Sequence, residues 1–216
     1  MPGAVVIGAG PGIGRSVAVR FAEEGLPLAV LARKAATVDA LAAEIPGALP
    51  LTADVADETA LRSALEAAVA HLGTPDAVVY NAAVIRSDAP GELSTRDHLA
   101  TYAVNVLGAL TAAAYVLPAM ARRGSGTFLV TGGMPAPVPA YTSLSLGKAG
   151  VRSLVALLDT EYGPSGVHVA TVTVAGAVAA GTAFDPDDIA GHYWRLHAQP
   201  RPGWEREYVY GGLVLP

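Results

Sequence analysis

Four glycines near the start of the chain have a spacing that suits the binding of an anion. They are Gly8, Gly10, Gly12 and Gly14. An apolar run over 4–7 precedes them, and a helical pattern that includes Ile13 follows, with apolar residues four apart on one face. Such a junction directs backbone N–H groups and the positive end of a helix at one point, which suits a pyrophosphate. Because the spacing differs from the common G-x-G-x-x-G fingerprint, an ordinary tight turn is the alternative interpretation.

A basic pair stands where the sequence can distinguish between two dinucleotides. Proteins that bind NAD place a carboxylate at the end of the second strand, where it bonds the ribose hydroxyls. Here the apolar run over 28–32 is followed by Arg33 and Lys34, with no acid nearby. A guanidinium suits a 2′-phosphate, so Arg33, with help from Lys34 or Arg15, favours NADP (NADPH) over NAD. A solvated surface pair is the alternative.

The composition narrows the classes of protein and partner. A chain of 216 residues has the length of one α/β domain. Its 14 Lys and Arg against 19 Asp and Glu give a net charge of −5 without a basic stripe, which argues against nucleic acid as a partner. Cysteine is absent and the five histidines lack metal-ligand spacing, so we expect no thiolate chemistry and no metal. With no signal-peptide pattern and no bilayer-length apolar stretch, we expect a cytoplasmic protein without a membrane partner.

Apolar β-type runs and helical patterns alternate along the whole chain. This alternation predicts an α/β fold: a Rossmann-type, doubly wound parallel sheet in three α/β/α layers. Together with the glycine turn, it predicts 1–216 as a single NAD(P)-binding domain. Pro50 lies in the third β-type run, which indicates an edge strand, as expected for the order 3-2-1-4-5-6. A long helix is predicted over about 94–122, and Pro118 is expected to kink it or shorten its end.

Several short motifs in a fixed order make the chain resemble the short-chain dehydrogenase/reductase family over nearly its whole length. The motifs are the glycine turn Gly8/Gly12/Gly14, Asp54-Val55, Asn81-Ala82-Ala83, Asn105-Val106-Leu107-Gly108, Lys148-Ala149 and Val174-Ala175-Gly176. Each is weak alone, but six in the correct order are strong evidence for the fold. The resemblance implies a nicotinamide cofactor, a small-molecule substrate and a homo-oligomer, a dimer or a tetramer.

The resemblance also implies roles for residues of the cofactor site. Asp54 is expected to accept a hydrogen bond from the adenine amino group, and Val55 to pack on the ring. Asn81, Ala82 and Ala83 are expected to line the cofactor, and turn chemistry is the alternative in each case. Ala175 and Gly176 stand where family members usually have Pro-Gly, so we place them in the cofactor site as well.

The catalytic residues of the family are not all present. Family members resembling this chain carry Ser and then Tyr-x-x-x-Lys, in which Tyr donates a proton and Lys holds the nicotinamide ribose. Four residues before Lys148 stands Leu144, which has no proton to give. The serine position falls at Gly132 or Gly133, although Thr131 is close by in the sequence.

A second tyrosine offers a different geometry. Tyr141 precedes Lys148 by seven residues, a separation that returns to nearly the same helix face. The longer spacing is similar to that of the divergent enoyl-reductase branch, and it suits reduction of a C=C bond beside a carbonyl. An aromatic that packs at the start of a helix is the alternative. Asn105 falls inside a helix, which Asn disfavours, so we expect it to bond backbone or hold water, with a catalytic role left open.

Two functional hypotheses follow. In the first, the protein is an NADP(H)-dependent oxidoreductase that reduces a carbonyl or conjugated enone, with Tyr141 as proton donor and Lys148 on the ribose. In the second, it is a catalytically impaired NADP-binding protein, a sensor or a non-redox scaffold. The second hypothesis is motivated by the missing Tyr and Ser, and by the short connection between the run over 167–174 and the helix that starts near Asp187.

Overall fold

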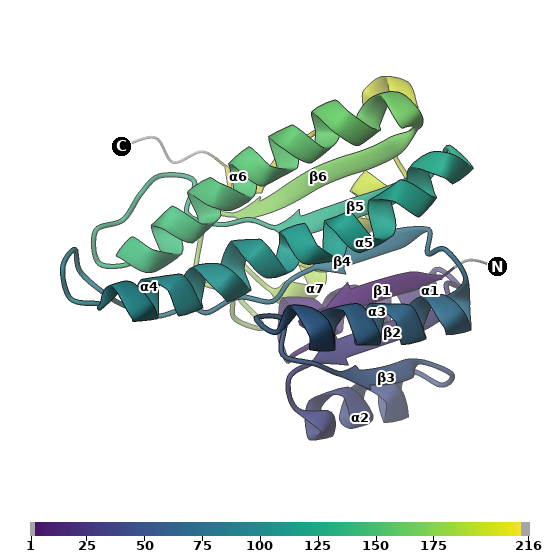
Figure 1. The fold of residues 1–216 in the computed structure, drawn as a ribbon, viewed down its shortest axis with the longest axis horizontal. Helices are drawn as coiled ribbons and strands as arrows, with labels where there is room; N and C mark the ends of the chain where they lie inside the picture. The colour runs from purple at the N-terminus through teal and green to yellow at the C-terminus, as the bar shows by residue number, and fades with distance from the viewer. Residues whose placement is uncertain (1–2, 213–216) are drawn as a thin grey trace.

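One parallel sheet organises the chain, of which the computed structural model describes residues 3–212 (Figure 1). Its strands are β1 (Ala4–Ile7), β2 (Leu28–Ala32), β3 (Leu49–Thr52), β4 (Ala77–Tyr80), β5 (Gly126–Thr131), β6 (Val167–Val174) and β7 (Glu207–Tyr210). They pair in the order β3-β2-β1-β4-β5-β6-β7, with every pairing parallel. The predicted doubly wound sheet is therefore confirmed, with β7 added beyond β6.

Burial differs between the centre and the edge of this sheet. All residues of β1, β2, β4 and β6 are buried, as expected for strands covered on both faces. In β3 half-buried and exposed residues alternate, and Pro50 is one of the exposed ones. The expectation that Pro50 marks an edge strand is correct, because an edge strand can lack one donor.

Helices cover both faces of the sheet, which completes the three layers. They are α1 (Ile13–Glu23), α2 (Ala35–Glu44), α3 (Glu58–Leu72), α4 (Thr95–Tyr102), η1 (Ala103–Leu107), α5 (Gly108–Arg123), α6 (Thr142–Tyr162), η2 (Gly163–Ser165), α7 (Pro186–His197) and η3 (Arg201–Gly203). One apolar core joins the sheet to α3, α5 and α6, and a second joins the opposite face to α1, α2 and α7. Figure 1 shows α3, α5 and α6 in front of the strands, with α7 behind them.

The long helix predicted over 94–122 contains a change of helical type. α4 begins after the N-cap residue Ser94, whose hydroxyl accepts a hydrogen bond from the N–H of Asp97. The five residues of η1 form a π-helix, a type often found as a bulge at functional sites, and α5 continues from it. Pro118 lies inside α5, which runs on to Arg123. The expectation that Pro118 shortens the helix is thus wrong, since packing on the sheet maintains the last turn.

The same segment also meets a membrane criterion that the sequence had not indicated. The continuous helical stretch Thr95–Arg123 has the length and mean hydropathy of a bilayer-spanning helix, and half of the qualifying window is buried inside the domain. Residues of α5 such as Ala112 and Leu117 belong to the core against the sheet. This is a core helix, and no membrane is indicated.

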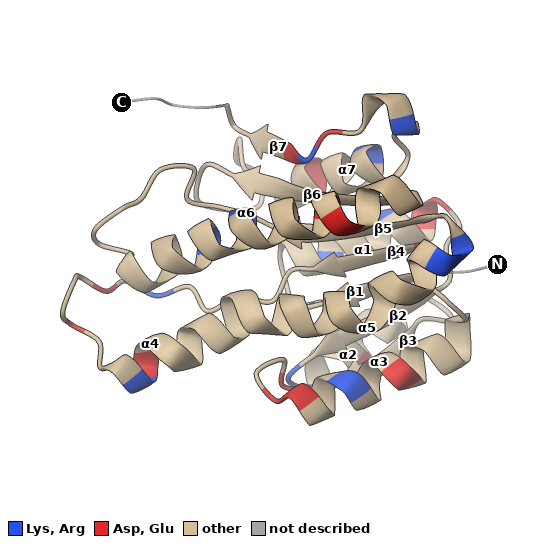
Figure 2. Ribbon diagram, turned by 45° about the horizontal axis from the view of Figure 1, so that its top comes forward, with Lys and Arg blue, Asp and Glu red and all other residues tan. Residues whose placement is uncertain are grey.

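Charged residues are spread over several elements. Figure 2 shows basic and acidic segments interspersed on the helices rather than gathered on one basic face. The helical stretch between Asp97 and Arg122 carries no charged residue, and it is tan in Figure 2 except near its ends.

Candidate active site

A pocket of about 990 Å³ opens where the carboxyl ends of the strands meet. Its walls come from the turn after β1, the ends of β2 and β3, the loops after β4, β5 and β6, and the start of α6. Ligands of open α/β sheets bind at this edge. Among the site residues predicted from the sequence, those that line the pocket are Gly8, Gly10, Gly12, Ile13, Arg33, Asp54, Val55, Asn81, Ala82, Ala83, Tyr141, Lys148, Ala175 and Gly176. Gly14 and Asn105 lie outside its lining.

The glycine turn divides into two pairs with different tasks. A Cβ on Gly8 would lie 2.4 Å from the Ala82 nitrogen, and one on Gly14 would lie 2.1 Å from the Gly8 oxygen, so both glycines permit close backbone packing. A Cβ on Gly10 or Gly12 would meet no atom within 4 Å. These two glycines therefore leave open space, and Gly12 is the N-cap of α1 without a side-chain cap. The arrangement fits an anion bound by the helix N-terminus.

The cations near this turn are not equivalent. Arg33 is exposed at the pocket rim, and it has no hydrogen bond or ion pair among the described residues. Arg15 pairs with Glu44 instead, and this hydrogen bond is the main cause that raises the Arg15 pKa. Arg15 is therefore engaged within the protein, and Arg33 is the guanidinium that remains available at the end of β2.

Asp54 and Val55, which follow β3, line the pocket next to the end of β2. One carboxylate oxygen of Asp54 accepts a hydrogen bond from the N–H of Ala56 at 3.0 Å, which orients the exposed side chain. Val55 is buried beneath it, with 9 % of its surface exposed. The pair thus contributes a carboxylate acceptor and an apolar side chain to the lining of the pocket.

A partly buried chain of hydrogen bonds connects the glycine turn to the neighbouring strands. The Asn81 amide donates to the Gly8 oxygen at 2.9 Å and accepts from the Thr131 hydroxyl at 2.8 Å. The Tyr193 hydroxyl of α7 lies 2.7 Å from the Thr131 hydroxyl. Since Thr131 donates to Asn81, Tyr193 is the donor to Thr131. Sequence reasoning missed Tyr193, because nothing in the sequence relates α7 to the end of β5.

Lys148 projects from α6 into the floor of the pocket. Only 6 % of it is exposed, and its ammonium donates to the Thr131 carbonyl oxygen at 2.6 Å. Burial first and the charge of Arg152 second lower the pKa of Lys148 to about 8. Arg152 lies one helical turn further along α6 and donates to the carbonyl oxygens of Gly133 and Met134, each at 3.1 Å. It thereby holds the loop after β5 in place.

The start of α6 places Tyr141 on the pocket wall. Tyr141 is the half-buried N-cap residue of the helix, and its side chain makes no cap. The buried carboxylate of Asp88 accepts hydrogen bonds from the Ser143 N–H at 2.9 Å and from the Ser143 hydroxyl at 2.6 Å. Asp88 therefore supplies the missing cap from the segment after β4 and fixes the backbone next to Tyr141.

Asn105 is buried in the π-helix with both ends of its amide engaged. Its oxygen accepts from the Val84 N–H at 2.7 Å, and its nitrogen donates to the Val84 oxygen at 3.2 Å. The expectation that Asn105 bonds backbone is met. Through Val84, which lines the pocket, Asn105 positions the loop after β4.

The connection between β6 and α7 is as short as the sequence indicates. It begins after Val174 and ends where α7 starts at Pro186. Phe184 packs over Gly176, where a Cβ would lie 2.3 Å from the ring. Thr182 is exposed and donates to the Ala179 oxygen at 2.7 Å. Across residues 3–212, no group of three or more His, Asp or Glu side chains is arranged to hold a metal.

Comparison with known proteins accounts for this arrangement. The profile of the family described as short chain dehydrogenase matches residues 3–186. The chain belongs to the short-chain dehydrogenase/reductase family. D-threitol dehydrogenase of Mycolicibacterium smegmatis is 31% identical over 179 residues, 79% of this chain and 68% of that protein. The chain is thus a member of an oxidoreductase family whose fold binds nicotinamide cofactors.

Solved structures of the family have the same architecture. A short-chain type dehydrogenase/reductase from Mycobacterium marinum has a TM-score of 0.89 and 26% identity, covering 100% of this chain and 96% of that one. An alcohol dehydrogenase from the archaeon Thermococcus sibiricus, complexed with 5-hydroxy-NADP, has a TM-score of 0.87 and 24% identity, covering 97% and 95%. At that identity the second likeness concerns the fold alone.

Within the short-chain dehydrogenase/reductase site, two positions differ physically from what the resemblance implies. Leu144, four residues before Lys148, is buried and lines the pocket, so it presents a hydrocarbon surface where a phenol is expected. A Cβ on Gly132 would lie 2.4 Å from the Thr173 hydroxyl, which leaves no room for serine. A Cβ on Gly133 would lie 3.6 Å from Lys148 Cε, an ordinary contact. Of the two glycines, only Gly133 has space for a hydroxyl-bearing side chain, and its φ of +157° would place that side chain on a strained backbone.

Proposed function

We propose that residues 1–216 form a single NADP(H)-binding domain that reduces a carbonyl or conjugated enone substrate. The observation that carries the proposal is the position of Lys148. Its side chain is largely buried, and it lines the same pocket as the glycine turn. In this proposal Lys148 binds the nicotinamide ribose and Tyr141 donates the proton. The proposal deepens the established family membership by assigning a cofactor, a reaction and two residues.

The preference for the phosphorylated dinucleotide is supported by Arg33. Its exposed guanidinium has no internal partner among the described residues, and no carboxylate follows β2. A guanidinium gives two parallel hydrogen bonds to a phosphate, whereas an adenosine ribose with free hydroxyls gives it nothing comparable.

In the proposed reduction, the polar and the apolar residues of the pocket have different roles. When bound, NADPH supplies a hydride. Tyr141 holds a proton at its hydroxyl and delivers it as negative charge develops on the substrate oxygen. The apolar side chains of Val84 and Leu144 line the pocket together with Tyr141 and limit the access of water, which strengthens the hydrogen bond to the developing charge.

Binding and turnover test this proposal separately. NADPH and NADH are titrated by fluorescence, and NADPH oxidation is followed with a panel of ketones, aldehydes and enones. We expect Tyr141→Phe to lower kcat by about 100-fold or more while NADPH affinity stays unchanged. Tyr115→Phe is the matched control, because Tyr115 lies on α5 outside the pocket. Full turnover in Tyr141→Phe would remove Tyr141 from the mechanism.

A second candidate function is favoured by Leu144 and Gly133. With a leucine in place of the family's tyrosine and a glycine in place of its serine, the protein binds NADP without transferring hydride, as a sensor or non-redox scaffold. Leu144→Tyr combined with Gly133→Ser distinguishes the two. Turnover that appears only in the double variant, from a parent that binds NADPH and is inactive on the whole panel, supports the second function.

We also propose a homo-oligomer, formed through the outer face of α4, α5 and α6. These helices, with η1 between α4 and α5, expose large apolar side chains: Leu99, Leu107, Leu110, Leu146 and Leu157. Scattered exposed leucines are normal, but here they lie on adjacent helices, and the stretch between Asp97 and Arg122 carries no charge. Light scattering of the wild type and Leu107→Arg tests this assignment, which a monomeric wild type would contradict.

A further inference from the structure

Lys148 has hydrogen-bonding and chemical capacity that the protein itself does not use. An ammonium carries three N–H groups, and the structure gives this one a single hydrogen bond, to the Thr131 carbonyl oxygen. Among the described residues no carboxylate lies within ion-pair distance of Lys148. The charged group that acts on it is Arg152, a second cation. A buried lysine beside a cation is an environment that favours the neutral amine, the nucleophilic form.

The pocket beside Lys148 has room for a reacting group. Leu144 stands one helical turn before it and contributes no polar group that would compete for the amine. Gly133 has no side chain, and a Cβ there would already be in van der Waals contact with Lys148 Cε at 3.6 Å. The space above the lysine side chain is therefore left open by glycine and lined by hydrocarbon.

We propose that Lys148 is a covalent carbonyl-binding site, which condenses with apolar aldehydes to form an imine when no nucleotide is bound. The amine nitrogen attacks the aldehyde carbon, and a C=N bond replaces the C=O bond. The carbonyl oxygen leaves as water with the two protons of the neutral amine, so the step needs no oxidant or reductant. This reactivity goes beyond the proposed reduction and does not depend on hydride transfer.

The surroundings of Lys148 support both the nucleophile and the choice of aldehyde. With a pKa lowered to about 8, its neutral fraction near pH 7.5 is on the order of a hundredfold larger than that of an ordinary lysine. The side chains that line the same pocket as Lys148 include Val84, Leu144 and Val174, which suit an aromatic or aliphatic aldehyde rather than a charged one.

The chain contains its own control for a labelling experiment. Lys34 is the only other lysine in the sequence, and it is exposed. The wild-type protein is incubated with benzaldehyde and sodium cyanoborohydride, which reduces an imine to a stable benzylamine. Peptide mapping by mass spectrometry then compares the two lysines and scores the amino terminus separately. We expect labelling of Lys148 to exceed that of Lys34 by about tenfold or more near pH 7.5.

Protection by nucleotide separates this inference from the proposed function. If Lys148 binds the ribose, saturating NADPH lowers its labelling and leaves that of Lys34 unchanged. Preferential labelling without protection supports the imine site and contradicts the role of Lys148 in cofactor binding. Equal labelling of the two lysines, or no label on Lys148, overturns the inference whatever NADPH does.

A variant confirms the assignment of the label. Lys148→Arg keeps the positive charge and removes the reactive amine, so benzylation within residues 3–212 should be confined to Lys34. A thermal melt checks that the variant folds. If it does not, the comparison of Lys148 with Lys34 within the wild-type chain still decides the question. Replacing benzaldehyde with glyoxylate, which is anionic, should reduce labelling of Lys148 if the apolar walls select the aldehyde.

Discussion

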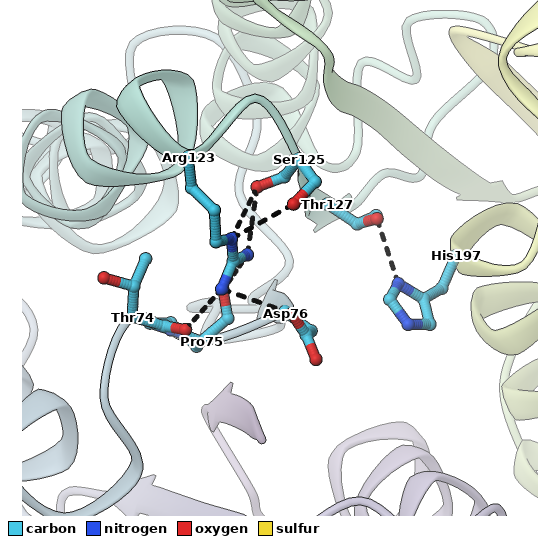
Figure 3. Close-up of polar contacts among 7 residues, drawn as sticks. All are labelled: Thr74, Pro75, Asp76, Arg123, Ser125, Thr127 and His197. Carbon is cyan, nitrogen blue, oxygen red and sulfur yellow. Dashed lines mark hydrogen bonds and ion pairs between the residues drawn. The ribbon is translucent and has the colours of Figure 1, made fainter. Parts of the chain in front are cut away.

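Arg123 at the amino end of the sheet and Arg33 at its carboxyl end differ in how far the protein engages their guanidinium groups. At the amino end Arg123 donates to the carbonyl oxygens of Thr74, Pro75 and Ser125 at 2.6–3.1 Å, and its guanidinium lies 3.2 Å from the Asp76 carboxylate (Figure 3). At the carboxyl end Arg33 has no such partner among the described residues, and Lys148 has a single hydrogen bond. The amino end also has a pocket of about 220 Å³, against about 990 Å³ at the carboxyl end.

This difference suggests that Arg123 contributes to the stability of the fold, whereas the free cations at the carboxyl end are available to bind a ligand. A guanidinium whose donors are all engaged by the loops around it stabilises those loops, and it has little left for a ligand. Arg123 also lies in the last turn of α5, where a cation is favoured by the helix dipole. At the carboxyl end the donors left free by the fold, together with space beside glycine, are what a phosphorylated ligand can use. The comparison predicts that substitutions at the two ends change different measurements.

Filling the open space at Gly10 in the glycine turn should have the largest effect, and the effect should be on NADPH affinity. Gly10→Val places a branched side chain in space that is open in the protein, so the fold should tolerate the substitution. The same side chain would occupy the space that the pyrophosphate needs. We expect NADPH affinity to fall by about 100-fold or more, or about 2.7 kcal/mol, with little change in Tm. Gly191→Val in α7, where a Cβ also meets no atom within 4 Å, is the control. Unchanged affinity in Gly10→Val would place the dinucleotide elsewhere.

Removing the exposed guanidinium should change selectivity more than stability. Arg33→Ala is expected to weaken NADPH binding by about tenfold or more and to leave NADH binding nearly unchanged, because the 2′-phosphate loses a charge-assisted hydrogen bond. Fluorescence titrations with both nucleotides measure the ratio. Lys34→Ala is the neighbouring control. A ratio that changes equally in the two variants would show that the effect is general surface charge.

The matching change at the amino end should alter stability alone. Arg123→Met removes the donors that several carbonyl oxygens share, and we expect unfolding to become easier by about 1–3 kcal/mol. The side chain is about one quarter exposed, since 26% of its surface is accessible, so water can replace part of the loss. Urea denaturation measures the change, with Arg122→Met as control. NADPH affinity should stay unchanged, and a loss of affinity would contradict the division of tasks between the two ends.

The smallest effect is a dependence of stability on pH. The pKa of Lys148 is lowered from 10.5 to about 8 in the folded protein, so between these values the unfolded chain holds more protons. The free energy of unfolding should therefore rise with pH, by about 1 kcal/mol between roughly pH 7.5 and 9 without nucleotide. Burial raises the pKa of Tyr80 and Tyr193 above the ordinary value of 10.0. Their effect is to lower the free energy of unfolding, and it sets in near that pH, where these tyrosines begin to ionise in the unfolded chain. Urea titrations should show no such rise in Lys148→Met.

Local patterns were sufficient for most of the fold. The β-type runs, the glycine turn and Pro50 predict the sheet and its edge, because strand period, turn conformation and the missing donor of proline are properties of short segments. Pro118 does not shorten the helix as one of its two predicted effects required, because the helix around it is stabilised by packing on the sheet, which no local rule includes. The π-helix around Asn105 shows only as a residue that disfavours a helix.

For the site, too, some features follow from the sequence and others only from the tertiary structure. By itself the sequence determined that a glycine turn precedes a helix, that Arg33 follows β2 without an acid, and that Leu144 stands four residues before Lys148. Only the tertiary structure decided which groups remain free: Arg15 pairs with Glu44, Asn105 is engaged by Val84, and Lys148 is left with one bond. The reason is physical, since a side chain's partners come from segments distant in the sequence, and the free energy of an unused donor depends on them.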